Sequence, residues 1–307
     1  MDLADFIRDF PGEASCKAKF KAFREQAGVA CPKCGSREHY WKSDKEMYEC
    51  KHCGYRQGLK TNTAMHKSKL PFRYWFLAMH LLTSAKKSFS AAELQRQLGH
   101  KRYHPVWHLS HKLRTAMGLR DGEYVLAGRI ELDEGYFSTG IPAGQKDEPL
   151  ERGRGSQVLL MAESEFVENP KPGKKPRRAG YLKMKVIDDL QKETIDGQVQ
   201  TLAKNTDGID ADDSTSYVDL KDFVPRHNTR VIPKEETGEI LPWVHIAIGN
   251  DKRQVLNTYH NIKPEFLQKY LDEFCYKFNR RYFGEALFGR LLVACVSYKN
   301  EFRYIYG

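Results

Sequence analysis

Four cysteines near the N-terminus constrain this chain more than any other feature. They form two Cys-x-x-Cys pairs separated by fifteen residues: Cys31, Cys34, Cys50 and Cys53. Two thiolate pairs at this spacing can hold one Zn²⁺ tetrahedrally, and a glycine directly follows each pair. The pattern therefore predicts a zinc ribbon of two short hairpins over residues 29–58, with one structural zinc ion. The alternative is disulfides or incidental buried thiols, which are rare at such a spacing in a reducing compartment.

Charge and hydropathy narrow the class of protein. The 307 residues carry 50 Lys and Arg against 40 Asp and Glu, a net charge of +10. Such an excess favours a polyanion, first of all nucleic acid, although a merely basic protein would have the same charge. No apolar run approaches the roughly eighteen residues of a membrane span, and the acidic N-terminus does not have the pattern of a secretory signal. We therefore expect a cytoplasmic protein without a membrane partner.

The region after the ribbon has the pattern of three helices. An apolar segment over 71–84 is expected to lie in a core. A capping box at Ser90 opens a short helix that Gly99 stops, and a basic helix follows and ends at Gly118. A short helix, a turn with glycine and a basic helix resemble a helix-turn-helix, which predicts DNA docking by the third helix. The alternative is a helical linker that only packs against its neighbours.

Strand patterns begin after residue 124. Alternating segments over 124–138, 156–164 and 181–189 precede a helix over 193–204, and the chain is mostly helical from Pro242. This order predicts an α/β layer in which helices cover a sheet. The segment ENPKPGKKPRRAG over 168–180 reads as a polar loop, either a solvated hairpin tip or a group of five basic side chains along a phosphate backbone.

Acidic residues recur at the ends of these strands. Glu131 and Asp133 share one face of the first strand, and a second cluster, DGIDADD over 207–213, is expected to place an aspartate at the end of a short strand. A carboxylate on a central strand is costly unless it binds something, so a metal site is predicted; an exposed edge strand is the alternative.

A third segment, PWVHIAIGNDKR over 242–253, adds polar side chains to this region. In a helix it places His245, Gly249 and Lys252 on one face, with Asn250 off that face by one residue.

The chain resembles the DDE-type insertion-sequence transposases that carry an N-terminal zinc ribbon. The matching segments cover nearly the whole chain in the family's order: CPKCGS, CKHCGYR, KLPFRYWFLAMHLLT, ELQRQLGHKRY, IELDEGYF, DDSTSY, PWVHIAIGNDKR and LQKYLDEFCYKFNRRYF. The resemblance implies an RNase H-like, integrase-like catalytic domain in which two aspartates and a third ligand hold two Mg²⁺ or Mn²⁺ ions. By this match Asp133 is the first catalytic aspartate and Asp212 the second, with Asp213 as the alternative.

The third ligand departs from the family pattern. Many relatives have a glutamate seven residues before a lysine, and here His245 stands seven residues before Lys252. Other branches use asparagine, which makes Asn250 a second candidate. Neither side chain is anionic at neutral pH, so the site has one negative charge fewer. The resemblance implies that Lys252 contacts phosphate or orients the helix over the site.

Together these features predict a multidomain α+β protein. Residues 1–60 are expected to form a helical lead-in and the zinc ribbon, 61–120 the helix-turn-helix-like region, and 121–307 the RNase H-like catalytic domain. The implied function is the transposase of a bacterial insertion sequence, which binds terminal inverted repeats in double-stranded DNA and catalyses metal-dependent cleavage and strand transfer as a homo-oligomer. Two alternatives stay open: a zinc-ribbon DNA-binding protein with an inactive transposase-derived domain, and an RNase H-like nuclease that does not join strands.

Overall fold

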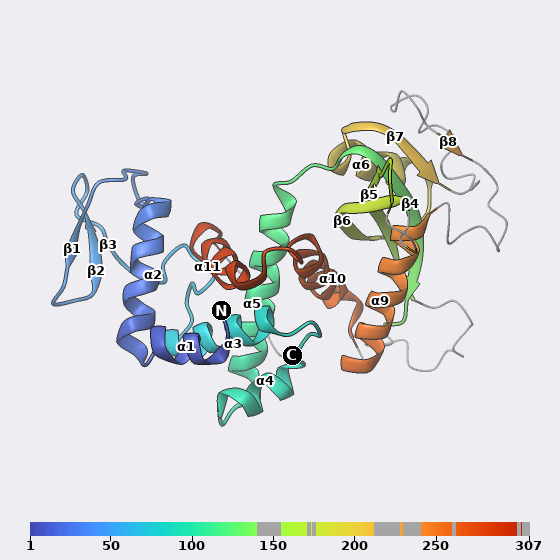
Figure 1. Ribbon diagram of the computed structural model, residues 1–307. Coiled ribbons are helices and arrows are strands. Elements are labelled where there is room, and N and C mark those ends of the chain that lie inside the picture. Colours follow the sequence, from blue (N-terminus) through green and yellow to red (C-terminus); the bar gives the residue numbers. More distant parts are fainter. Residues whose placement is uncertain are drawn as a thin grey trace, which may run out of the picture. The chain divides into compact units, whose positions relative to one another are not determined.

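The computed structural model describes residues 1–139, 155–170, 173, 176–211, 228–229, 241–259, 262–299 and 302. The chain divides into two compact units (Figure 1): Met1–Arg120 together with Arg280–Gly307, and Asp121–Asn279. Among the described residues, no helix combines the length and the apolar character that crossing a membrane requires.

The first unit begins with two helices and the ribbon. Helices α1 (Leu3–Asp9) and α2 (Glu13–Ala27) are separated at Pro11-Gly12. Three short antiparallel strands follow in the order β1 (His39–Lys42), β2 (Met47–Cys50) and β3 (Arg56–Gly58). The buried guanidinium of Arg24 on α2 donates to the carbonyl oxygens of Gly58 and Leu59, which ties the end of the ribbon to the preceding helix.

Along the described part of the chain the first unit also has the helices α3 (Phe72–Ser84), α4 (Ala91–Leu98), α5 (Tyr103–Gly122) and α11 (Leu287–Ser297), with a short 3-10 helix, η2 (Gly284–Ala286), before the last. The predicted caps of α4 are confirmed, because the Ser90 hydroxyl accepts from the Glu93 amide at 3.1 Å and Gly99 is left-handed with φ 63°. The predicted end of α5 at Gly118 is wrong. The helix continues to Gly122, and its last turn includes the buried Asp121, whose carboxylate accepts from the Asn279 side-chain amide at 3.0 Å and whose carbonyl accepts from the Lys183 ammonium at 2.9 Å. These tertiary contacts oppose the roughly 1 kcal/mol that an interior glycine costs.

The C-terminal helix belongs to this unit by its packing. Helix α11 packs against α2 and α3, and the Cys295 carbonyl accepts from the Ala64 amide at 2.8 Å. The sequence placed 121–307 in one catalytic domain, whereas the compact unit that holds the large sheet ends at Asn279. The reason is the apolar face of α11, which completes the core of the N-terminal helices.

The second unit contains a five-stranded sheet in the order β6-β5-β4-β7-β8. Its strands are β4 (Ala127–Phe137), β5 (Ser156–Phe166), β6 (Arg177–Ile187), β7 (Asn205–Ala211) and β8 (Asn228–Thr229). Strand β5 is antiparallel to both β4 and β6, while β7 runs parallel to β4 and β8 parallel to β7. Three antiparallel strands followed by two strands parallel to the first form the predicted RNase H-like arrangement.

Strand β4 lies at the centre of this sheet, so the alternative of an exposed edge strand is excluded. Its two faces differ in chemistry. Ile130 and Leu132 pack with Ile195 and Val199 of α6 (Lys192–Leu202) in an apolar cluster. Glu131 and Asp133 point to the opposite face, where both contact α9 (Pro242–Thr258). Helix α10 (Pro264–Asn279) packs against β6.

The polar loop predicted over 168–180 is shorter than expected, because β6 already begins at Arg177. Arg177 was expected at a solvated tip or on a phosphate backbone. Instead its side chain is only 14% exposed and pairs with Asp210. Ion pairing inside the sheet is favourable for a guanidinium that would otherwise be buried alone. The lysines of this segment, Lys171, Lys174 and Lys175, lie outside the described residues.

Candidate functional site

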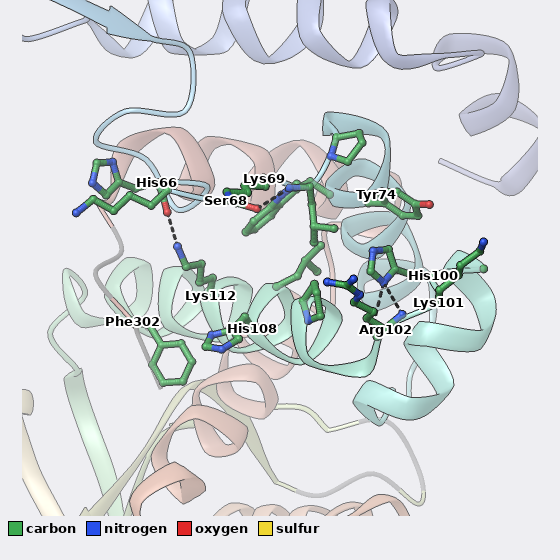
Figure 2. A pocket seen from close by; sticks show the side chains of 17 residues that line it. His66, Ser68, Lys69, Tyr74, His100, Lys101, Arg102, His108, Lys112 and Phe302 are labelled. Atoms are coloured by element: carbon green, nitrogen blue, oxygen red, sulfur yellow. Dashed lines mark hydrogen bonds between the residues drawn. The ribbon is translucent and has the colours of Figure 1, made fainter. Parts of the chain in front are cut away.

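A basic groove hollows the first unit beside the helix-turn-helix-like region (Figure 2). The cavity has a volume of about 1260 Å³, and its walls come from the segment after the ribbon, α3, the α4–α5 turn and α5. Its cationic lining residues are Lys67, Lys69, Lys101, Arg102 and Lys112, and none of the described residues that line it is Asp or Glu. The Lys112 ammonium donates to the His66 carbonyl at 2.5 Å, which joins α5 to the segment after the ribbon.

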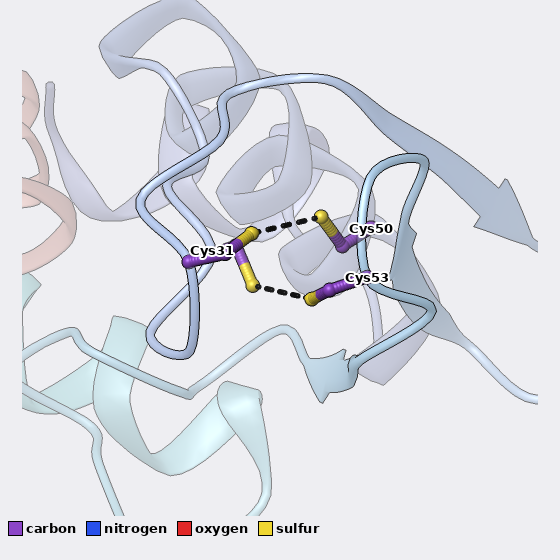
Figure 3. A group of neighbouring side chains, drawn as sticks. Cys31, Cys50 and Cys53 are labelled. Atoms are coloured by element: carbon purple, nitrogen blue, oxygen red, sulfur yellow. Dashed lines mark hydrogen bonds between the residues drawn. The ribbon is translucent and has the colours of Figure 1, made fainter.

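The four cysteines of the ribbon meet at one point (Figure 3). The Sγ atoms of Cys31 and Cys53 are 3.6 Å apart, as are those of Cys34 and Cys50, and all four lie within 4.8 Å of one another. A tetrahedral Zn²⁺ with Zn–S bonds of about 2.3 Å separates its sulfur ligands by about 3.8 Å. The four thiols therefore fit one zinc ion, as the spacing predicted.

Local backbone geometry explains why the cysteines converge. Gly35 and Gly54 adopt φ of 74° and 68°, which permits a tight turn after each Cys-x-x-Cys pair. In each turn the glycine amide donates back to the carbonyl of the first cysteine, at 2.9 Å for Cys31 and 3.0 Å for Cys50. Burial tends to raise the pKa of Cys50, but backbone amides aimed at its sulfur, together with the thiols of Cys34 and Cys53, lower its pKa to about 6, while the same contacts among the thiols raise the pKa of Cys34.

The second unit brings Asp133 and His245 together. Asp133 Oδ2 on β4 is 3.7 Å from His245 Nδ1 on α9, and the two side chains are 13% and 36% exposed. The other carboxylate oxygen of Asp133 accepts from the Glu134 amide at 2.8 Å. A carboxylate oxygen and an imidazole nitrogen this close suit a shared divalent ion such as Mn²⁺, whereas Mg²⁺ prefers oxygen ligands.

The positions of Lys252 and Asn250 around the axis of α9 show which of them lies on the same side as His245. Lys252 follows His245 by seven residues, so it returns to within about 20° of the same direction, while Asn250 is turned away by about 140°. The Lys252 ammonium lies 5.6 Å from the ring centroid of Phe137, at the end of β4 beyond Asp133. The Asn250 side chain is exposed and accepts from Arg253 at 2.7 Å. Asp133, His245 and Lys252 thus share a region that Asn250 faces away from.

Asp212 and its alternative Asp213 lie outside the described residues. The strand that leads to them is described, and it runs parallel to β4 with Glu131 opposite Asp210. Asp210 stands two residues before Asp212 in the chain, as Glu131 stands two residues before Asp133.

An ionic cluster on β4, β6 and β7 was not predicted from the sequence. Asp210 accepts from Arg129 Nε at 2.7 Å and from Arg177 Nη2 at 2.7 Å, and Arg177 Nη1 lies 3.6 Å from Glu131. Burial tends to raise the pKa of Asp210, but the two arginines outweigh it and lower the pKa, so the carboxylate is ionised. The sequence did indicate that Glu131 and Asp133 share one face of the strand. It could not indicate their arginine neighbours, because those depend on how the strands are aligned in the sheet.

The two candidates for the third ligand can be separated by metal binding. We expect His245→Ala to weaken Mn²⁺ binding by about tenfold or more, since loss of a direct ligand costs at least as much as loss of a supporting residue. Asn250→Ala is expected to change it less than about twofold, because its side chain is turned away. Calorimetric Mn²⁺ titration of the free protein measures both. Equal losses, or a larger loss in Asn250→Ala, would contradict the assignment of His245.

Two family profiles match the chain. An ISXO2-like transposase domain matches residues 125–279, and a transposase zinc-ribbon domain matches residues 11–56. The second match includes α2, which Arg24 ties to the ribbon.

The chain is also similar to an uncharacterized protein in transposable element ISH50 of Halobacterium salinarum, with 23% identity over 159 residues. The similarity covers 49% of this chain and 52% of that protein, so the chain spans about half the length of the relative it matches. Among solved structures, the crystal structure of the Mos1 strand transfer complex matches with 13% identity and a TM-score of 0.26, over 76% of this chain and 81% of that one. A score this low supports no comparison of individual elements.

Proposed function

Because the chain belongs to the family of ISXO2-like transposases, we propose that it is the transposase of an insertion sequence, which cuts DNA at the ends of the element and joins those ends to a target. The observation that carries this proposal is the approach of Asp133 Oδ2 to His245 Nδ1 at 3.7 Å, between the central strand and α9 of an RNase H-like sheet.

In the proposed site Asp133, Asp212 and His245 bind divalent metal. A metal bound by these residues would supply charge stabilisation for an in-line phosphoryl transfer. The parallel register of β4 and β7 supports Asp212 as the second aspartate, because Asp210 stands opposite Glu131 and the two aspartates follow by equal steps in the chain. Lys252 supplies a cation for a DNA phosphate at the end of β4. Asn250 is the second choice for the third ligand.

The proposed chemistry needs no covalent link between protein and DNA. Water attacks the phosphodiester at the end of the element, and the P–O3′ bond breaks to leave a 3′-hydroxyl there and a 5′-phosphate on the flanking DNA. This hydroxyl then attacks a phosphodiester of the target strand, whose own 3′-oxygen leaves as a hydroxyl. The role of the protein is therefore to hold the reacting groups in line and to neutralise charge on the phosphate. By analogy with the family we expect a homo-oligomer to hold the two ends of the element.

We further propose that the basic groove binds the DNA backbone. Four of its cationic side chains, those of Lys67, Lys69, Lys101 and Arg102, are exposed; they come from the segment after the ribbon and from the α4–α5 turn, so one stretch of phosphates can contact both. Contacts of this kind position a duplex without reading its sequence. We expect α5 and the ribbon to contact the base edges.

The groove can be tested by the salt dependence of DNA binding. We expect the triple variant Lys69→Gln, Lys101→Gln, Arg102→Gln to bind duplex DNA more weakly and to reduce the slope of log K against log salt by about 2–3, since each lost phosphate contact reduces it by about 0.9. Fluorescence anisotropy between low and physiological salt measures the slope. The matched control is Lys86→Gln, Lys87→Gln, Arg96→Gln, which has the same charge change outside the groove. An equal effect in the control would show that net charge alone is responsible.

The proposed activity is tested by a joining assay. The protein is incubated with a labelled terminal repeat, a supercoiled target and Mn²⁺, and cleaved and joined products are separated on a gel. Joined product is the expected result. Cleavage without joining would favour an RNase H-like nuclease, and binding without cleavage would favour an inactive, transposase-derived DNA-binding protein; either outcome overturns the proposal.

A further inference from the structure

We propose that Glu131 is a positioning residue that fixes the start of α9 on the central strand and thereby sets the separation of His245 from Asp133. The effect on DNA processing rests on the function proposed above. The effect on the site itself rests on the hydrogen bonds of Glu131 alone.

Glu131 caps α9 from a distant part of the chain. Its side chain is fully buried, and Oε2 accepts from the Trp243 amide at 2.7 Å and from the Val244 amide at 3.2 Å. The first amides of a helix have no partners within the helix. In α9 the first residue, Pro242, has no amide hydrogen, and the His245 amide already donates to the Leu241 carbonyl. Glu131 therefore satisfies the two amides that remain.

The carboxylate of Glu131 is itself held by neighbouring strands. Its other oxygen, Oε1, accepts from the Ser164 hydroxyl of β5 at 2.6 Å and lies 3.6 Å from Arg177 Nη1 of β6. Arg177 in turn binds Asp210 of β7. Burial raises the pKa of Glu131, while the hydrogen bonds from Ser164 and α9 and the charge of Arg177 oppose that rise. The positive end of the helix dipole adds to the attraction.

Two contacts between β4 and α9 therefore lie side by side: that of Glu131 with the first amides of α9, and that of Asp133 with His245. On β4, Glu131 stands two residues before Asp133 on the same face; on α9, Val244 directly precedes His245. The contact of Glu131 holds the start of α9, and next to it Asp133 and His245, the two proposed ligands, lie 3.7 Å apart. Without the contact of Glu131, the start of α9 loses its two hydrogen bonds to β4, and its position on the strand is then less closely fixed. Ligands must lie within a few tenths of an ångström of their bonding distance, so a shift of α9 weakens metal binding.

The test compares Glu131→Gln and Glu131→Ala with a matched control. Gln keeps the size of the side chain and one carbonyl oxygen for the α9 amides, whereas Ala removes every contact. The control is Glu163→Gln. Glu163 is also buried in the sheet and accepts from the amides of Ala127 and Tyr181 at 3.0 and 2.8 Å, but it pairs with Ile130 and so belongs to the face that α6 covers.

The main readout is Mn²⁺ affinity of the free full-length protein, followed by electron paramagnetic resonance. We expect Glu131→Ala to weaken it by about 10-fold to 100-fold and Glu131→Gln by less, the range observed when a residue supporting a metal ligand is lost. Glu163→Gln is expected to lower the melting temperature while its Mn²⁺ affinity stays within about twofold of the wild type. The affinity for DNA is expected to be unchanged in all three variants, and circular dichroism and zinc content verify folding.

The outcomes separate this inference from the proposed function. Wild-type Mn²⁺ affinity in both Glu131 variants, or an equal loss in Glu163→Gln, would overturn the positioning role even where Asp133→Asn abolishes cleavage. Conversely, if the Glu131 variants lose Mn²⁺ but the wild type neither cleaves nor joins DNA, the positioning role stands and the transposase proposal fails. If the wild type binds no Mn²⁺, or binds it equally well after Asp133→Asn, both the positioning role of Glu131 and the proposed transposase site are contradicted.

Discussion

Asp133→Asn is expected to abolish DNA cleavage and joining, with a rate reduced by about 10³-fold or more, equivalent to about 4 kcal/mol of transition-state stabilisation. The substitution preserves the size of the side chain and removes the negative charge that we propose binds metal. Asn can still accept the 2.8 Å hydrogen bond that the Glu134 amide donates to Asp133, so the strand is expected to keep its shape. The rate of 3′-end release from a labelled terminal repeat in Mn²⁺ measures the effect.

The matched control for Asp133→Asn is Asp207→Asn. Asp207 lies on β7 of the same sheet and is exposed, so this variant makes the same chemical change away from α9 and is expected to retain wild-type rates. DNA binding is expected to be unchanged in both variants, because the basic groove belongs to the other compact unit. A rate for Asp133→Asn within tenfold of the wild type would remove Asp133 from the catalytic assignment.

Loss of zinc is expected to unfold the ribbon. Its three strands are only three or four residues long, and strands this short do not form a stable sheet by themselves. In zinc-finger peptides the bound metal contributes about 10–16 kcal/mol, which is then also folding energy. We expect about one zinc per chain in the wild type, as four thiolates bind one ion, and none in Cys31→Ser/Cys34→Ser. That variant is expected to be cut by protease within the ribbon and to bind terminal-repeat DNA at least about tenfold more weakly.

The matched control for the ribbon is Cys16→Ala. Cys16 is buried on α2 and is not one of the four clustered cysteines, so its loss tests a cysteine substitution in the same unit without removing a zinc ligand. One zinc per chain and a protected ribbon are expected. Zinc retained in Cys31→Ser/Cys34→Ser would show that the metal is held elsewhere.

The features that the sequence predicted well are those whose causes lie within a few residues. The zinc ribbon follows from two Cys-x-x-Cys turns, each closed by a glycine with positive φ. The ends of α4 follow from Ser90 and Gly99. The opposite orientation of Ile130 and Asp133 follows from strand alternation. Each depends on local backbone geometry, which is largely independent of what packs around it.

Local patterns failed where burial decides the outcome. The end of α5 was placed at Gly118 because glycine stops isolated helices, yet tertiary packing carries the helix to Gly122. Arg177 was read as part of a polar loop because of its Pro, Gly and Lys neighbours, yet it begins a strand and enters the ionic cluster with Glu131 and Asp210. Both errors concern positions where contacts with distant residues outweigh local preference.

The sequence alone predicted the side chains that we propose bind metal: the four thiols, Asp133, Asp212, and either His245 or Asn250. Only the tertiary structure placed His245 3.7 Å from Asp133 and turned Asn250 away, because the rotation of α9 depends on how its start is held. That start is held by Glu131, 112 positions before Trp243 in the chain. Contacts at such separations arise only when strand register and helix packing are set together, so no local pattern specifies them.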